Sequence, residues 1–329
     1  MKLKKLLWLP LAALLLNGCA LGKTVEPSVA QERLVTAVQE TEDVELDTYA
    51  TTTKGESTIV TKDYEGDRVV ATEKTTSKYE GALKAKGLKS DEPELSAVYE
   101  EITEEKIDGV ETYYLKHNEE FYVKNRWLYG GFKTIVRENG GAVTEEQKGK
   151  MDISDIDFKE ISLLDFLGGF SAGQYVLEAP DEKSLAMIYA IAAEVEAKEM
   201  LGTLTITYKL DIKSMIRIML MIFGLDITTL TDEERAEFEA QVDAAVEEMG
   251  DTITVNKYEM TIVISKEGYI QKMRTDIDML NKEYDDEVEP KVLLATQEVK
   301  MVDEINATIN KKVTINFPDL STYQEAQPQ

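Results

Sequence analysis

Hydrophobic and polar residues alternate along this chain with two different periods, and each period predicts one kind of element. Apolar residues recur at the spacing of one helix face over residues 29–40, and they do so again over residues 184–200. Thr203–Asp211 instead alternates apolar and polar residues one by one, which is typical of a half-buried strand. The chain therefore combines helices with strands.

Most of the remaining segments are rich in Thr, Val and Tyr and predict β-strands. We expect strands over residues 46–54, 57–62, 68–79, 95–103, 110–116, 120–129, 252–265, 269–280, 292–302 and 308–317. The turns between them are expected at Lys54-Gly55, Glu65-Gly66-Asp67, Asp108-Gly109 and His117-Asn118. Residues 81–94 and 138–150 indicate surface connections.

Three further segments predict helices. Ile161–Phe170 is short and apolar, and Ser214–Phe223 is apolar on almost every side. Thr231 followed by Glu234 matches a capping box, which predicts that a helix begins there. About ten antiparallel strands, with helices near the start and in the middle, indicate an α+β fold.

The first residues have the pattern of an export signal. Lys2, Lys4 and Lys5 precede the apolar run Leu6–Leu16, which is too short for a bilayer span of about 20 residues. The run ends in Leu16-Asn17-Gly18-Cys19, which resembles the bacterial lipobox. The resemblance implies cleavage before Cys19 and acylation of its thiol, which would anchor the chain to the extracytoplasmic face of the cell membrane. The alternative is a plain secretory peptide with an incidental Cys.

This pattern also predicts how the chain is organised. Residues 1–18 are the expected signal peptide, residues 19–28 a lipidated tether, residues 29–320 the folded body and residues 321–329 a polar tail. The body is either one continuous curved sheet or two α+β units joined near residues 168–180.

Charge and composition exclude several function classes. The chain has 37 Lys and Arg against 63 Asp and Glu, a net charge of −26, which repels phosphate backbones and argues against nucleic-acid binding. One Cys and one His leave no disulfide framework and no cluster of zinc ligands. The sequence contains no nucleophile elbow, phosphate loop or dinucleotide fingerprint, so we expect a protein without enzymatic activity, cofactor or metal.

Two sets of short phrases resemble known families. The opening helix after Cys19, the Thr-rich strands, the segment Val110–Trp127 and the closing segments at 258–264, 270–279 and 314–318 resemble the LolA/LppX-like superfamily. They are similar in particular to Gram-positive lipoproteins of unknown function. Residues 62–70 and 151–158 resemble a second group, the small YehR-type lipoproteins. The first resemblance spans residues 29–326, and the two cannot both describe the whole chain.

The first resemblance implies a fold and a ligand. The fold is a strongly curved antiparallel sheet, a half-barrel, with helices on its concave face. Members with known roles carry acyl chains between the sheet and the helices. The methionine-rich helix at residues 214–223 offers a soft apolar surface that suits such ligands. The alternative, which the sequence favours, is that these side chains fill the core of the sheet. The ligand-binding candidates are Trp127, Tyr129, Phe166, Phe170, Met215, Met219, Ile222 and Phe223.

Two further groups of residues are candidate sites. His117 is expected on a surface turn without a catalytic partner. Asp152, Asp155 and Asp157 are closely spaced, but no Gly or bidentate Glu follows at the distances of a calcium loop.

The sequence supports two function hypotheses. In the first, the chain is a lipid-anchored extracytoplasmic binding protein that holds a lipid or acyl chain between sheet and helices. In the second, it is an accessory surface lipoprotein with a solid core that binds an envelope protein partner.

Overall fold

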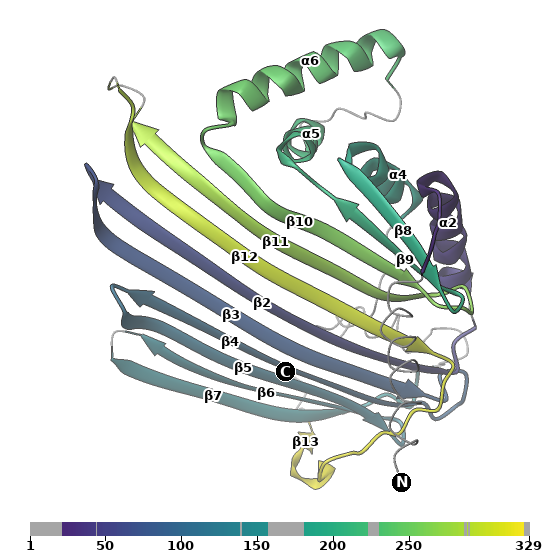
Figure 1. The fold of residues 1–329 in the computed structure, drawn as a ribbon. Helices are drawn as coiled ribbons and strands as arrows, with labels where there is room; N and C mark the ends of the chain where they lie inside the picture. The colour runs from purple at the N-terminus through teal and green to yellow at the C-terminus, as the bar shows by residue number, and fades with distance from the viewer. Residues whose placement is uncertain are drawn as a thin grey trace, which may run out of the picture.

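Most of the described chain belongs to a single β-sheet. The computed structural model describes residues 22–43, 45–138, 140–156, 181–222, 230–285, 288 and 290–325. Their thirteen strands pair in the order β1-β8-β9-β10-β11-β12-β2-β3-β4-β5-β6-β7-β13 (Figure 1). All the pairs are antiparallel except that of β13 with β7, which is parallel.

The elements have the following bounds. The strands are β1 (Lys23–Thr24), β2 (Thr48–Glu65), β3 (Arg68–Lys86), β4 (Glu94–Ile107), β5 (Val110–Lys124), β6 (Trp127–Glu138), β7 (Gly141–Asp152), β8 (Glu194–Met200), β9 (Thr203–Lys209), β10 (Ile253–Ile264), β11 (Ile270–Asp285), β12 (Val292–Ile309) and β13 (Gln324–Glu325). The helices are α2 (Pro27–Asp43), α4 (Glu182–Ile191), α5 (Ile212–Ile222), α6 (Asp232–Met249) and the 3-10 turn η2 (Leu320–Thr322).

The predicted fold class, an α+β half-barrel with helices closing a concave antiparallel sheet, is wrong. The structure is dominated by one mixed, unclosed sheet of thirteen strands, several of them 15 to 19 residues long. The four described α-helices gather beside β8–β10 and leave much of the sheet uncovered (Figure 1). The sheet is larger than expected because several segments predicted as turns or connections are paired strand residues.

Gly55 shows why strands that look separate in the sequence are continuous. Lys54-Gly55 was predicted as a turn, but Gly55 lies inside β2 opposite Tyr79 of β3. A Cβ at position 55 would be 2.3 Å from Cε1 of the Tyr79 ring. The glycine therefore makes room for an aromatic side chain and does not reverse the chain.

Of the other predicted turns and connections, some are confirmed and some lie inside strands. The turns at Gly66 and at Asp108-Gly109 are confirmed, with φ of 62° at Gly66 and 83° at Gly109. His117-Asn118 lies in the middle of β5, and residues 141–152 of the predicted surface connection form β7. Residues 81–86, predicted as a loop, belong to β3.

The predicted helices that the structure describes begin close to their expected first residues. The helix at residues 29–40 and the capping box at Thr231–Glu234 are confirmed by α2 and α6. The helix predicted over residues 184–200 is wrong in its second half, because α4 ends at Ile191 and residues 194–200 form β8. The apolar segment at 214–223 is helical as far as Ile222, within α5. The predicted helix Ile161–Phe170 and the boundary at 168–180 lie outside the described residues.

The two faces of the sheet differ in character. On one face, which we call the helix face, Leu83, Leu95, Ile206 and Ile262 are fully buried in one cluster with Leu34 of α2. Alternate residues of the same strands point to the other face, which we call the open face, and many of these are charged. The main core therefore lies between the helix face and α2 and α4.

The chain after β12 crosses the open face. Only the start of the strand predicted at 308–317 is confirmed, because β12 ends at Ile309. The segment then leads through η2 to β13, which pairs with β7 at Gly149 and Lys150. Tyr323 in this segment is 4% exposed, so part of the expected polar tail is a packed element. Residues 326–329 lie outside the described part.

Candidate functional site

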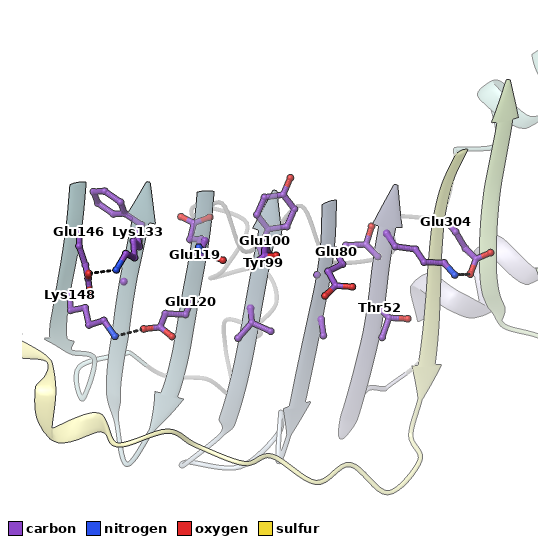
Figure 2. Close-up of a pocket in the computed structure, with 18 of the residues that line it drawn as sticks. Thr52, Glu80, Tyr99, Glu100, Glu119, Glu120, Lys133, Glu146, Lys148 and Glu304 are labelled. Atoms are coloured by element: carbon purple, nitrogen blue, oxygen red, sulfur yellow. Dashed lines mark ion pairs between the residues drawn. The ribbon is translucent and has the colours of Figure 1, made fainter. Parts of the chain in front are cut away.

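The open face carries two adjoining cavities of about 680 and 810 Å³. They share Lys54, Glu80 and Glu100, and together they extend from β10 to β7. We call this continuous hollow the open-face trough. Figure 2 shows the part lined by β12 and β2–β7. Among the described residues, those that line the two cavities all belong to strands.

The trough has charged walls and a partly apolar floor. Val98, which is 40% exposed, and Ala82 lie side by side on β4 and β3 and form part of that floor. The charged residues that line the two cavities are Lys54, Glu56, Lys78, Glu80, Glu100, Glu119, Glu120, Lys133, Glu146, Lys148, Lys257, Arg274, Asp276, Asp278, Lys300 and Glu304. Both signs are therefore present along its length.

Glu304 is the most buried of these charges, with its side chain 9% exposed. Its Oε2 atom lies 2.7 Å from Nζ of Lys272 and 3.3 Å from Nη1 of Arg274, and its Oε1 atom lies 3.4 Å from Nζ of Lys54. Hydrogen bonds from Lys272, Asn306 and Arg274 lower the pKa of this carboxyl to about 2. Side chains from β11 and β2 thus converge on one carboxylate of β12, which stays ionised at neutral pH.

Several of the other charges form cross-strand pairs. Lys78 and Glu56 lie opposite each other on β3 and β2 with 2.9 Å between Nζ and Oε1. Lys133 and Glu146 lie opposite each other on β6 and β7 at 3.1 Å. Lys257 of β10 reaches diagonally to Asp276 of β11 at 2.6 Å. Opposite charges on neighbouring strands stabilise a sheet modestly, and when they are exposed they can exchange partners.

The C-terminal segment runs along one end of the trough (Figure 2). The Tyr323 hydroxyl donates a hydrogen bond to Glu120, which also pairs with Lys148 at 3.0 Å. Burial of the Glu120 carboxyl raises its pKa, but the hydrogen bonds from Tyr323 and Lys148 outweigh that effect and leave the pKa lowered. The Tyr323 ring contacts Tyr122 and Tyr129 edge-on.

The structure places the predicted ligand residues apart. Trp127 and Tyr129 lie on the open face, where Nζ of Lys150 is 4.4 Å from the Trp127 ring and Tyr129 packs 5.5 Å from Tyr323. They adjoin the trough without lining it. Met215 belongs to α5, which packs on α6 on the other side of the sheet, so these three residues do not share a site.

The remaining predicted residues are only partly described. Met219 and Ile222 belong to α5, but their side chains fall outside the described part of the structure, as do Phe166, Phe170, Phe223 and Cys19. Ile216, which also belongs to α5, is 2% exposed and packs with Phe238 and Val242 of α6. This part of α5 is therefore a core element.

His117 and Asp152 have structural roles. His117 was predicted on a turn, but it lies inside β5, where Nδ1 is 2.8 Å from Oγ1 of Thr134. Asp152 accepts hydrogen bonds from the backbone and side chain of Ser154, and Asp157 lies outside the described residues. Within the described ranges, no group of three or more His, Cys, Asp or Glu side chains is placed to hold a metal ion.

Sequence reasoning missed the trough, although a signal for it was present. Charges of opposite sign stand two positions apart in Lys54-x-Glu56, Lys78-x-Glu80 and Arg274-x-Asp276. This spacing places them on one face of a strand. The pairing of distant strands, which brings β12 beside β2, could not be read from that spacing.

Comparisons with known proteins show no family for this chain. No family model matches, and no curated protein matches. Among solved structures, the translocator domain of autotransporter NalP from Neisseria meningitidis aligns at 7% identity over 85% of this chain and 95% of that one, with a TM-score of 0.19. A bifunctional dehydratase-cyclase domain from ambruticin biosynthesis aligns at 8% identity over 85% and 82%, with a TM-score of 0.11. TM-scores this low establish no shared fold.

No helix in the described part of the chain is long and apolar enough to cross a bilayer.

Proposed function

We propose that this chain is a lipid-anchored protein of the extracytoplasmic face that binds a polypeptide partner in the open-face trough. The anchor is the expected acylation of Cys19, for which the signal-like N-terminus and the lipobox resemblance are the support. The observation that carries the binding role is the trough itself, a hollow lined by cross-strand charge pairs on the face of the sheet opposite the four described α-helices.

The shape of the trough favours a macromolecule over a small ligand. Small-molecule sites bury about 70–90% of the ligand surface. Here the side chains of Lys54, Lys78 and Glu56 are 65%, 64% and 59% exposed, so a small ligand beside them would remain largely in water. The trough also crosses nine neighbouring strands, about 40 Å at the usual strand spacing, which suits an extended partner.

The charge pattern favours a polypeptide. A chain of net charge −26 repels nucleic acid, whereas a trough with both signs can match a protein surface that also carries both. Exposed pairs such as Lys78–Glu56 stabilise the fold by about 0.2–1 kcal/mol, so a partner can replace them at little cost. The expected result is specific binding that weakens with salt.

Site-specific photocrosslinking tests this proposal. A photoreactive residue at Val98, on the trough floor, should give one discrete protein adduct in cells, and the purified adduct partner should bind the purified chain. The same residue at Val143, which is exposed but outside the trough, is the control. Equal adducts from both positions, or a captured protein that does not bind in purified form, would contradict the proposal.

A second candidate function is favoured by a row of methionines on the helix face. Met260, Met273, Met279 and Met301 are partly buried there, and the backbone register places Met301 beside Ile277 and Met279 beside Val299. Flexible thioethers form an adaptable apolar surface, which could take an acyl chain. Native mass spectrometry of the chain starting at Ala20 would detect a co-purified lipid, and Met279→Asp should abolish it.

A further inference from the structure

The β8–β9 hairpin ends in an exposed apolar residue held in an unusual backbone conformation. Leu201 is 92% exposed, and the preceding Met200 is 53% exposed. Leu201 has a φ of 52° and is followed by Gly202 at 82°. Among the described residues, the other non-glycine residues with positive φ are Asp108, Asn125, Arg126 and Asn310, all of them polar. Because Leu201 is almost fully exposed, packing in the folded chain does not explain why a leucine occupies this tip.

The hairpin lies where the chain leaves the folded body toward its N-terminus. β1 pairs with β8 through Lys23 and Glu199, only two positions from Leu201. A Cβ at Gly22 would lie 3.5 Å from the Glu199 carbonyl oxygen. Gly22 is three positions from Cys19, a reach of about 10 Å at most. An acylated Cys19 would therefore hold this tip close to the bilayer surface.

The charges around the tip suit lipid headgroups. Lys198 and Lys266 flank the hairpin with side chains 65% and 69% exposed, and they make exposed ion pairs with Glu196 at 3.3 Å and Glu267 at 3.7 Å. Such exposed pairs are weak, so these long basic side chains can still reach headgroups while a neighbouring apolar residue enters the membrane. The nearby Glu199 carboxylate is paired with Arg33 at 2.8 Å, which reduces its repulsion of anionic lipid.

We propose that the β8–β9 hairpin is a membrane-contact site, in which Leu201 and Met200 enter the bilayer interface beside the lipidated Cys19. The site rests on the proposed lipid anchor. With the hairpin in the membrane, the long strands would extend away from the bilayer, because the β8–β9 tip and the β4–β5 turn at Asp108-Gly109 lie at opposite ends of the sheet. The bilayer would then leave the trough accessible.

A single label tests the proposal on the full lipidated chain. Acylation consumes the thiol of Cys19, the one natural Cys, so Leu201→Cys and Val110→Cys each provide a unique site for a polarity-sensitive fluorophore. Val110 is 68% exposed and adjoins the opposite turn, which makes it the matched control. The chain would be reconstituted in vesicles of phosphatidylglycerol and phosphatidylethanolamine, some carrying spin-labelled acyl chains.

The fluorescence emission of the label at position 201 should shift to shorter wavelength and be quenched by the spin-labelled lipid. The label at position 110 should show neither change. If the chain floats with the vesicles but both labels stay in water, the hairpin site is refuted and the anchor stands. If the chain does not float and Cys19 itself takes the label, the anchor is refuted and the hairpin site with it. Leu201→Asn should weaken quenching of a label at Met200→Cys without lowering the melting temperature, because Asn tolerates positive φ.

Discussion

Tyr323 donates a hydrogen bond to Glu120 across 203 positions of sequence, and this contact fastens the C-terminal segment to the wall of the trough. The ring is 4% exposed and lies against Tyr122 and Tyr129. Glu120 also pairs with Lys148 inside the trough, so one carboxylate links the segment to the candidate binding surface.

Removing the Tyr323 side chain should release this segment. Tyr323→Ala should lower the free energy of unfolding by about 3 kcal/mol, because a buried aromatic ring is lost. Tyr323→Phe keeps the ring and should cost only about 1 kcal/mol. Urea unfolding gives both values, and hydrogen exchange should rise at residues 320–325 in the Ala variant. Equal losses in the two variants would mean that the hydroxyl, and not the ring, holds the segment.

Neutralising Glu304 should destabilise the fold although the chain is strongly acidic. Glu304→Gln leaves Lys272, Arg274 and Lys54 without their shared carboxylate, which should cost about 3 kcal/mol. Glu298→Gln is the control, because that side chain is 45% exposed and its ion pair is with the exposed Lys300. It should change the unfolding free energy by less than about 1 kcal/mol in urea titrations. A stabilised Glu304→Gln variant would show that relief of net charge outweighs the lost pairs.

The same carboxylate predicts a pH dependence. The hydrogen bonds from Lys272, Asn306 and Arg274 lower the folded-state pKa of Glu304 to about 2 from an ordinary 4.5. A lowered pKa stabilises the fold above pH 4.5, and that stabilisation is lost as the pH falls from 4.5 toward 2. The stability difference between the wild type and Glu304→Gln should therefore shrink across this window in unfolding experiments. A difference that stays constant down to pH 2 would contradict the assignment.

Local patterns predicted individual elements well where one face of the element is buried. Thr203–Asp211 was predicted as a strand from its alternation, and β9 confirms it because Leu204, Ile206 and Tyr208 are fully buried. The capping box at Thr231 is confirmed because its hydrogen bonds are local to the chain.

The size of the sheet and the trough could not be predicted locally. Gly55 and His117 resemble turn residues in the sequence, but each is fixed by a partner on another strand, Tyr79 and Thr134 respectively. Residues 194–200 carry a helix-compatible pattern, but pairing with β9 makes them a strand. The binding surface depends on such pairings, since the Lys54–Glu304 contact joins residues 250 positions apart in sequence.

Replacing Gly55 should test the long-strand arrangement. Gly55→Ala places a Cβ against the Tyr79 ring and should cost about 2 kcal/mol. In a Tyr79→Ala background the same replacement should cost nothing or stabilise slightly, because the clash is gone and Ala suits a strand better than Gly. Unfolding curves of the four chains give the coupling. Equal costs in both backgrounds would contradict the packing of Tyr79 over Gly55.

Exchange of the Lys78–Glu56 pair tests the central claim most directly. The double variant Lys78→Glu/Glu56→Lys keeps an ion pair between β3 and β2 but reverses its direction in the trough. Binding of the purified crosslinked partner should weaken about tenfold in the single variant Lys78→Glu, and it should remain weak in the double variant although the melting temperature recovers. An affinity that returns to the wild-type value in the double variant, or never changes, would contradict recognition by the open-face trough.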